Sequence, residues 1–319
     1  MKRFALLAVL ALFAGCGDDA PDTVGEPSPT ESRNLAIVAT IPTGDGPIML
    51  AASSTSLWVE LHREDTVSRI DPETNEEVEK FTDKLYAHCQ VLPGANDDIW
   101  LSIAKRSYVT RIDGTTGAEL DRVVVRDACS LALDGDAVWV VGPGTGDVSL
   151  VRPGEEQESE THRVAKGLGA VALVEDALWF SSEGTRGTVL RMDRATHQVT
   201  KAASDYPFAD VVVAGSTGLW VSSRQSNLLW KADPTDGRLL ESVEVRRPSG
   251  ILEHDGRLWV TTLDGELITF DPATLDEVSR TNLGYVWLGP PVFAFDSLWV
   301  AALEDNVVLR VDPELLTES

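Results

Sequence analysis

The sequence predicts an all-β fold, a seven-bladed β-propeller with four-stranded blades, and three observations lead to it. A tryptophan flanked by hydrophobic residues returns about every forty residues. An Asp-initiated turn follows most of these tryptophans, and the last repeat is one strand short. A period near forty residues with short strands is typical of propeller blades.

The tryptophan repeat sets the number of blades. Seven of the nine tryptophans belong to it, and successive ones are 42, 39, 40, 41, 39 and 40 residues apart. They are Trp58, Trp100, Trp139, Trp179, Trp220, Trp259 and Trp299. Each repeat has room for four β-rich runs, as in repeat six at 250–253, 257–262, 266–270 and 277–281.

A turn signal follows the tryptophan in six repeats. Its Asp can accept a hydrogen bond from the backbone two residues on, and Pro presets the φ of a turn position. The six copies begin at Asp71, Asp113, Asp193, Asp233, Asp271 and Asp312. The third repeat offers Arg152-Pro153-Gly154 instead. We expect these turns on the face opposite the ligand-binding one.

The two ends of the domain are predicted to complete one blade together. The last repeat holds only three strands, whereas a β-rich run at 35–41 precedes the first blade and resembles fourth strands such as 239–245. Pairing this run with the last repeat would close the ring and cover an exposed strand edge. Residues 34–319 are therefore expected to form one propeller domain.

The N-terminal 33 residues are predicted to be an address and a tether. Lys2 and Arg3 precede an apolar run that is too short to span a bilayer permanently. Residues 12–16 resemble the bacterial lipoprotein signal, so we expect a signal peptide at 1–15 and a lipidated Cys16; a secretory signal with a chance cysteine is the alternative. Residues 16–33 are acidic and proline-rich, which predicts a disordered tether. The protein is expected to be extracytoplasmic and lipid-anchored to a bacterial membrane.

The charge balance restricts the partners. The formal net charge is −24, and such a surface repels phosphate backbones, whose binding needs clusters of Lys and Arg. Nucleic acid is therefore excluded as an expected partner, and the membrane is reached only through the lipid anchor. We expect a monomer.

Cys89 and Cys129 are the only cysteines besides Cys16. They occupy equivalent places in adjacent repeats, and an oxidising compartment allows one disulfide between them. We favour the disulfide over two buried free thiols.

The blade pattern resembles that of a known group of proteins. Residues 67–72 and 109–113 are its clearest copies, and they are similar to the RIDPxTG segment of seven-bladed propellers of the YVTN and virginiamycin B lyase type. The likeness covers the whole domain and implies the fold. The repeated Trp, Asp and Arg or Lys residues are interpreted as blade packing, because a residue that recurs in every blade marks architecture.

One face of the propeller is the predicted binding face. It carries the loops that lead into the first strand of each blade and the loops between strands two and three, and it is called the funnel face below. Aromatic and cationic side chains, which supply energy at specific interfaces, are enriched there. The candidate ligand-binding residues are Tyr86, His88, Arg224, Arg247, Tyr285 and Trp287. We expect a protein, peptide or glycan ligand, although solvated loops with Trp287 capping the channel are the alternative.

The family resemblance also implies an alternative function, a metal-assisted lyase or hydrolase of the virginiamycin B lyase type. A His and Glu pair would carry it, with Glu60, His62 and His88 as candidates. Glu60 and His62 share one side of an extended strand, but the specific motif of the family is not found around them. The inner strands are largely apolar, with Asp127 and Asp210 as the only suggestive ligands, so we expect no metal and no cofactor. Catalysis is the less favoured interpretation.

Overall fold

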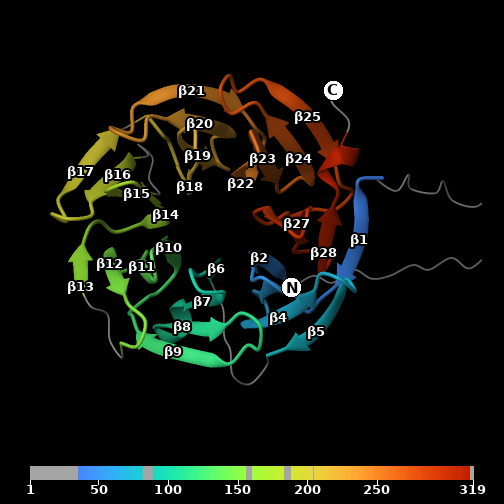
Figure 1. The fold of residues 1–319 in the computed structure, drawn as a ribbon. Coiled ribbons are helices and arrows are strands. Elements are labelled where there is room, and N and C mark those ends of the chain that lie inside the picture. The colour runs from blue at the N-terminus through green and yellow to red at the C-terminus, as the bar shows by residue number, and fades with distance from the viewer. Residues whose placement is uncertain (1–34, 82–88, 156–159, 183–187, 204, 317–319) are drawn as a thin grey trace, which may run out of the picture. The chain divides into compact units, whose positions relative to one another are not determined.

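Seven four-stranded antiparallel sheets form a ring (Figure 1). The computed structural model describes residues 35–81, 89–155, 160–182, 188–203 and 205–316. Besides strands, these residues contain two short 3₁₀ helices, η1 (Ala104–Arg106) and η2 (Pro313–Leu315). The predicted all-β, seven-bladed propeller is confirmed. No helix in the described ranges is long and apolar enough to cross a membrane.

The first four blades follow one another along the chain. Blade one holds β2 (Pro47–Ala52), β3 (Leu57–Leu61), β4 (Thr66–Asp71) and β5 (Glu76–Lys80). Blade two holds β6 (Gln90–Pro93), β7 (Asp98–Ile103), β8 (Tyr108–Asp113) and β9 (Glu119–Val124). Blade three holds β10 (Ser130–Asp134), β11 (Ala137–Gly142), β12 (Asp147–Val151) and β13 (Glu160–Arg163). Blade four holds β14 (Leu168–Val174), β15 (Ala177–Ser182), β16 (Thr188–Asp193) and β17 (Val199–Ala203).

The last three blades complete the ring. Blade five holds β18 (Val211–Ala214), β19 (Leu219–Ser223), β20 (Leu228–Ala232) and β21 (Leu239–Glu244). Blade six holds β22 (Pro248–His254), β23 (Arg257–Thr262), β24 (Glu266–Phe270) and β25 (Glu277–Asn282). Blade seven holds β26 (Val292–Ala294), β27 (Ser297–Ala302), β28 (Val307–Val311) and the N-terminal strand β1 (Ile37–Pro42).

Strand β1 closes the ring as predicted. It pairs antiparallel with β28, with Thr40 opposite Leu309, and the two strands lie side by side in Figure 1 although they come from opposite ends of the chain. The last blade therefore has four strands like the others, and the outer edge of β28 is covered.

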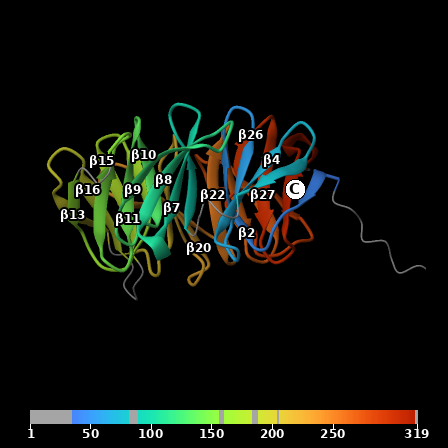
Figure 2. The same cartoon turned by 90° about the horizontal axis from the view of Figure 1, so that it is seen from below.

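The hydrophobic core lies between blades. Trp58 of blade one is fully buried in a cluster with Val91, Ile99 and Leu101 of blade two, and the same blade-to-blade packing recurs around the ring. Each sheet buries its faces only against its neighbours, which is why the blades fold as one unit. Figure 2 shows the blades from the side, with loops on both faces.

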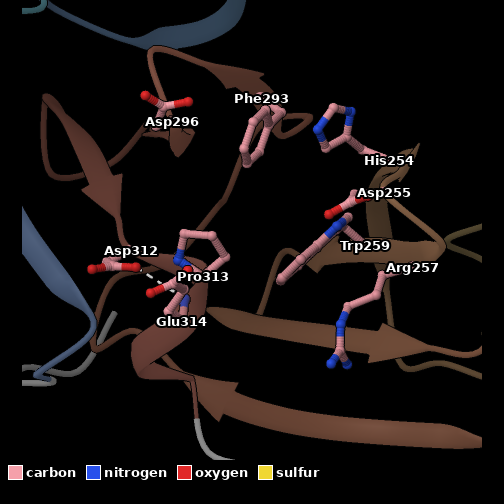
Figure 3. Close-up of a pocket in the computed structure, with 9 residues that line it drawn as sticks. All are labelled: His254, Asp255, Arg257, Trp259, Phe293, Asp296, Asp312, Pro313 and Glu314. Atoms are coloured by element: carbon pink, nitrogen blue, oxygen red, sulfur yellow. Dashed lines mark hydrogen bonds between the residues drawn. The ribbon is translucent and has the colours of Figure 1, made fainter.

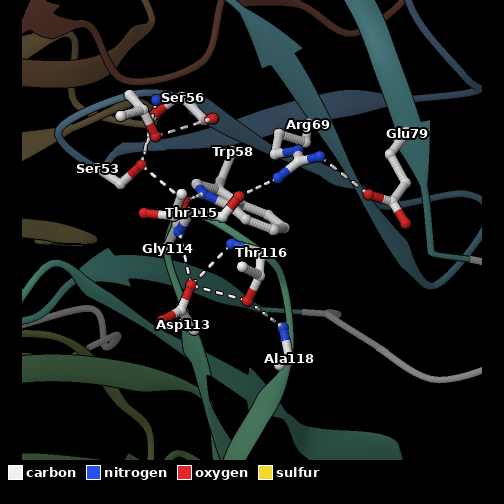
Figure 4. A network of polar contacts seen from close by, with 11 residues as sticks. Ser53, Ser56, Trp58, Arg69, Glu79, Asp113, Gly114, Thr115, Thr116 and Ala118 are labelled. Atoms are coloured by element: carbon white, nitrogen blue, oxygen red, sulfur yellow. Dashed lines mark hydrogen bonds and ion pairs between the residues drawn. The ribbon is translucent and has the colours of Figure 1, made fainter.

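Polar contacts join the blades at the Asp turns (Figure 4). The indole Nε1 of Trp58 donates to the Gly114 carbonyl of the next blade at 3.0 Å, and the Ser53 hydroxyl donates to the same oxygen at 2.8 Å. Asp113 holds the turn, because its Oδ1 accepts from the backbone N–H of Thr116 at 2.7 Å. The Arg69 guanidinium lies 5.9 Å from the Trp58 ring centroid. The repeated Trp, Asp and Arg residues thus pack and join the blades.

Candidate functional site

A cavity of about 710 Å³ is lined by the first strand of every blade, namely β2, β6, β10, β14, β18, β22 and β26. Its wall is largely apolar, with side chains such as Met49, Leu131, Val171, Val212 and Ile251. We call it the central cavity. Sites for small molecules measure roughly 300–1,000 Å³ and combine apolar walls with a few polar groups, so this cavity can take a ligand or an inserted side chain.

Asp210 and Arg224 supply the charged groups of this wall. The leading loop of β18 positions Asp210, and the loop between β19 and β20 positions Arg224. The Asp210 Oδ2 accepts from the Arg224 Nε at 2.6 Å, whereas its Oδ1 is buried and has no hydrogen-bond partner in the described ranges. Burial raises the pKa of Asp210, and the hydrogen bond and charge of Arg224 oppose the rise without cancelling it.

Trp287 stands at the rim on the side of blades six and seven, and Arg247 lies beside it without being among the described residues that line the cavity. Trp287 lines the cavity and is 39% exposed, although it is a large hydrophobic residue. The Arg247 guanidinium lies 6.0 Å from the Trp287 ring centroid and is held by Asp264, 2.6 Å from Arg247 Nη1 to Oδ1. The contact with Asp264 holds the guanidinium next to the Trp287 ring.

The leading loops share a backbone feature that presents these side chains. Twelve residues before the repeat tryptophan stands a residue with φ between 47° and 73° in six blades: Gly46, Asp127, Gly167, Phe208, Arg247 and Trp287. Its carbonyl can tie the leading loop to the loop after strand two, as where Leu263 N–H donates to Arg247 O at 3.0 Å and Leu303 N–H to Trp287 O at 3.1 Å. For bulky side chains this conformation costs about 1–2 kcal/mol. Because the position recurs in six blades, it belongs to the architecture of the leading loops.

The other predicted binding residues differ in position. Tyr285 is not among the described residues that line the central cavity; its hydroxyl lies 3.5 Å from the Thr40 Oγ1. Tyr86 and His88 lie outside the described residues. By sequence interval, His88 holds the same place before Trp100 that Trp287 holds before Trp299.

Glu60 and His62 form a pair at the end of β3. The His62 Nδ1 lies 3.2 Å from the Glu60 Oε1, the Glu60 side chain is buried, and its Oε2 has no hydrogen-bond partner in the described part of the chain. The hydrogen bond to Glu60 raises the pKa of His62, against the opposing effect of burial. Neither residue is among the described residues that line the central cavity.

Cys89, Cys129 and Asp127 hold the leading loops in place. A disulfide joins Cys89 to Cys129, whose Cα atoms are 4.9 Å apart, and links blades two and three at the cavity wall. The Asp127 Oδ2 accepts from the N–H groups of Gly144 and Thr145 at 2.6 and 3.0 Å. Asp127 therefore stabilises a loop rather than presenting a free metal ligand.

A second pocket, of about 570 Å³, opens between blades six and seven on the opposite face (Figure 3). The His254 ring stacks on Phe293 with centroids 4.0 Å apart. The other residues around it are mainly charged turn residues, and Asp312 accepts a hydrogen bond from the Glu314 N–H at 2.9 Å. The larger and more apolar central cavity is the better candidate for a ligand site.

Sequence reasoning expected a central channel that Trp287 could cap, but it did not predict the volume or the apolar wall of the cavity as a ligand site. It examined the apolar inner strands only for metal ligands, because the residues that line the cavity come from all seven blades. It considered Asp210 only as a possible metal ligand and did not place it among the binding residues, although Asp210 lines the cavity.

The fold and this cavity define a class of protein, the seven-bladed β-propeller with an apolar central site. No family model and no curated protein matches the sequence. Solved structures do match.

Among the solved structures, the chain is similar to virginiamycin B lyase from Staphylococcus aureus (TM-score 0.71, 13% identity, 86% of this chain and 98% of the lyase). It is also similar to a chain of a mitotic checkpoint complex (TM-score 0.72, 13% identity, 96% and 99%). A third match is BamB from Moraxella catarrhalis (TM-score 0.58, 14% identity, 82% and 83%). At these identities the similarity shows the propeller fold.

Proposed function

We propose that this protein is a lipid-anchored, extracytoplasmic binding propeller that takes its ligand at the funnel mouth of the central cavity. One observation carries the proposal: the mostly apolar cavity of about 710 Å³ is lined by Asp210, whose buried Oδ1 has no hydrogen-bond partner in the described part of the chain, and by the exposed Trp287. Such a combination of apolar wall, polar group and aromatic rim is what a specific binding site needs.

The chemistry of the wall favours a peptide or a protein segment over a glycan. A glycan offers many hydroxyl groups, and the apolar side chains of the inner strands would leave most of them without partners. A hydrophobic side chain can instead fill the cavity, while an amine or amide N–H of the same segment donates to the Asp210 Oδ1. The negative net charge of the chain attracts cationic segments.

A peptide selection tests the binding site. A random peptide library would be panned on the immobilised full chain, and the selected peptides titrated against wild type, Asp210→Asn and Trp287→Ala. We expect peptides with an apolar anchor, whose affinity falls by about tenfold or more in each variant because each change removes a central contact. Selected peptides that bind wild type and both variants equally would place the site elsewhere. The matched control is His254→Ala in the opposite pocket, which should leave the peptide affinity unchanged.

The anchor is tested separately. Cys16→Ser is expected to move the protein from the detergent phase to the aqueous phase in detergent phase partitioning, with the unfolding temperature of the propeller unchanged. The Cys89→Ser, Cys129→Ser double variant keeps Cys16 and should stay in the detergent phase. A Cys16→Ser variant that still partitions with detergent would contradict lipidation at this residue.

A second candidate function rests on the hydrogen bond between Glu60 and His62. The pair has the composition of an acid and base, and the solved structures that resemble this chain include a virginiamycin B lyase with quinupristin. Metal-dependent opening of quinupristin, followed by chromatography and lost in both His62→Ala and His88→Ala, would favour a lyase. Quinupristin that stays intact with the metal-supplied wild type would count against it.

A further inference from the structure

Two histidines and one glutamate meet at the outer seam between blades three and four. Glu160 and His162 are two residues apart on β13, so their side chains share one side of the strand. His197 comes from the turn between β16 and β17 of the next blade. The histidines are 35 positions apart in the sequence, which is why no metal-ligand spacing was visible there.

The donor atoms have the separations of a coordination sphere. The Glu160 Oε2 lies 3.3 Å from the His162 Nε2 and 3.4 Å from the His197 Nε2, and the three atoms all lie within 4.8 Å of one another. Ligands about 2.0–2.1 Å from a tetrahedral ion are roughly 3.4 Å apart. The His162 and His197 rings are stacked with an interplanar angle of 29°, so at least one ring must turn for both in-plane lone pairs to reach one ion.

Neighbouring groups hold the ligands in place. The Glu160 Oε1 is taken by the Arg152 Nη2 at 3.3 Å, which leaves Oε2 for the imidazoles. The His162 and His197 rings stack with centroids 3.8 Å apart, and the Trp139 ring lies 6.4 and 6.2 Å from them.

His197 departs from the repeat at this position. The equivalent residue, four positions after the turn Asp, is Asn75, Gly117, Gly237 or Leu275 in other blades. His197 and these four residues all have φ between 55° and 74°. Histidine here accepts a left-handed backbone in order to present its ring to the neighbouring blade. The architecture of the turn does not need an imidazole, because glycine serves in blades two and five.

We propose that Glu160, His162 and His197 bind a divalent transition-metal ion, with Zn²⁺ as the expected ion, and that this ion links blade three to blade four. Two imidazoles and one carboxylate suit Zn²⁺, and also Ni²⁺ and Cu²⁺, rather than Mg²⁺ or Ca²⁺. The side chains are 25%, 26% and 32% exposed for His162, His197 and Glu160. Solvent can therefore reach the ion and fill its remaining position. The site lies on the outer strands and is independent of the proposed ligand site.

Zinc titration of the chelator-treated full chain tests the proposal. Calorimetry should show one Zn²⁺ per chain, with affinity about 100-fold weaker or lost in His162→Gln and His197→Gly, since removing even an outer-shell partner costs 10–100-fold. His197→Gly is chosen because glycine occupies the same turn position in blades two and five, so the variant should fold. Equal zinc binding by wild type and His197→Gly, or no binding by wild type at micromolar zinc, would overturn the proposal.

The chain offers a matched control at the end of β3. Glu60 and His62 have the same spacing in the sequence as Glu160 and His162, and each pair is in hydrogen-bond contact, through Nδ1 of His62 and Nε2 of His162. No second imidazole is within ligand distance of Glu60 and His62 in the described residues. His62→Gln should therefore keep the stoichiometry and affinity of wild type. A loss of zinc binding in this variant would place the ion at Glu60 and His62 and overturn the assignment.

Thermal unfolding gives a second readout. Because the ion binds only the folded state, Zn²⁺ at 100 times its Kd should raise the unfolding temperature by about 5 °C. Chelator should reverse the rise, Mg²⁺ should not reproduce it, and His197→Gly should show none. A zinc-induced rise of equal size in His197→Gly would contradict a link between the two blades through this residue.

Discussion

At the scale of single residues, the cavity wall places a carboxylate where the fold gains little from it. Asp210 is mostly buried, and one of its oxygens has no partner in the described ranges. Other acidic residues of the propeller, such as Asp113, accept several hydrogen bonds and hold turns. A buried group that costs stability is expected where a protein trades stability for binding.

Replacing Asp210 by Asn should raise stability at neutral pH. Burial raises the folded-state pKa of Asp210. Protonated Asp210 therefore contributes favourably to the free energy of unfolding below the ordinary pKa of about 3.9. This contribution is lost as the pH rises through the folded-state pKa. We expect Asp210→Asn to be at least as stable as wild type at pH 7, with the difference vanishing near pH 4. Urea unfolding across this range measures it.

Asp113 provides the opposite sign in the same experiment. Hydrogen bonds from Thr116 and Thr115 lower the pKa of Asp113, although burial opposes them slightly. The stabilising contribution of ionised Asp113 is present above the ordinary pKa of an aspartate, and it is lost as the pH falls through the folded-state pKa. Asp113→Asn should therefore lose stability at pH 7. A loss of the same sign for Asp210→Asn would show that its ion pair with Arg224 outweighs burial.

Trp287 should be replaceable by glycine without harm to the fold. Its φ of 55° suits glycine. Relief of backbone strain in the folded state and the greater entropy of glycine in the unfolded state offset each other, so the free energy of unfolding should change by no more than about 1 kcal/mol. Peptide binding should nevertheless be lost. Leu288→Ala, at a neighbour only 1% exposed, should instead cost about 2–4 kcal/mol by urea unfolding; a comparable loss in Trp287→Gly would mean that Trp287 is a core residue.

At the scale of elements, β1 determines whether the last blade is complete. It covers the edge of β28 and contributes Ile41 to the core between blades seven and one. Much of this could be predicted, because each blade has its own tryptophan, turn and strand pattern, and a missing fourth strand at one end matched an unassigned strand at the other. The repeat is a local signal, and propeller topology follows from counting it.

Deletion of residues 35–42 should open the ring. The deletion exposes the edge of β28 and removes buried apolar area, so we expect a lower unfolding temperature and concentration-dependent association in size-exclusion chromatography. Deletion of residues 17–33, the predicted tether, is the control and should leave both unchanged. A stable monomer without residues 35–42 would contradict the closing role of β1.

At the scale of the whole molecule, the two candidate sites depend on contacts between blades, and this is where sequence reasoning reached its limit. The central cavity needs all seven inner strands, and the Glu160, His162 and His197 cluster needs two neighbouring blades. The sequence placed Arg224 and Trp287 on the funnel face because loop positions can be counted within one repeat, and both line the cavity, whereas Arg247 is not among its described lining residues. It could not show that the Asp210 Oδ1 has no partner among the described residues, because that depends on how side chains from different loops pack.

The disulfide between Cys89 and Cys129 should contribute strongly to global stability. It closes a loop with a sequence separation of 40, for which the chain-entropy model gives about 4 kcal/mol. The Cys89→Ser, Cys129→Ser variant should lose an amount of this order in urea unfolding, without loss of the propeller circular dichroism. A reductant should lower the free energy of unfolding of wild type to that of the variant, and it should leave the free energy of unfolding of the variant unchanged. A reductant that changes wild type and variant equally would show that the bond is not formed.

The pairing of β1 with β28 also fixes the order of events during synthesis. Ile37 is among the first residues of the propeller to leave the ribosome, and its partner Val311 is among the last. The first strand must therefore remain unpaired with β28 until almost the whole chain has been made. Contacts between such distant residues are slow to form. A chain whose synthesis stops before β28 has no partner strand for β1, so the ring closes only when that strand has been made.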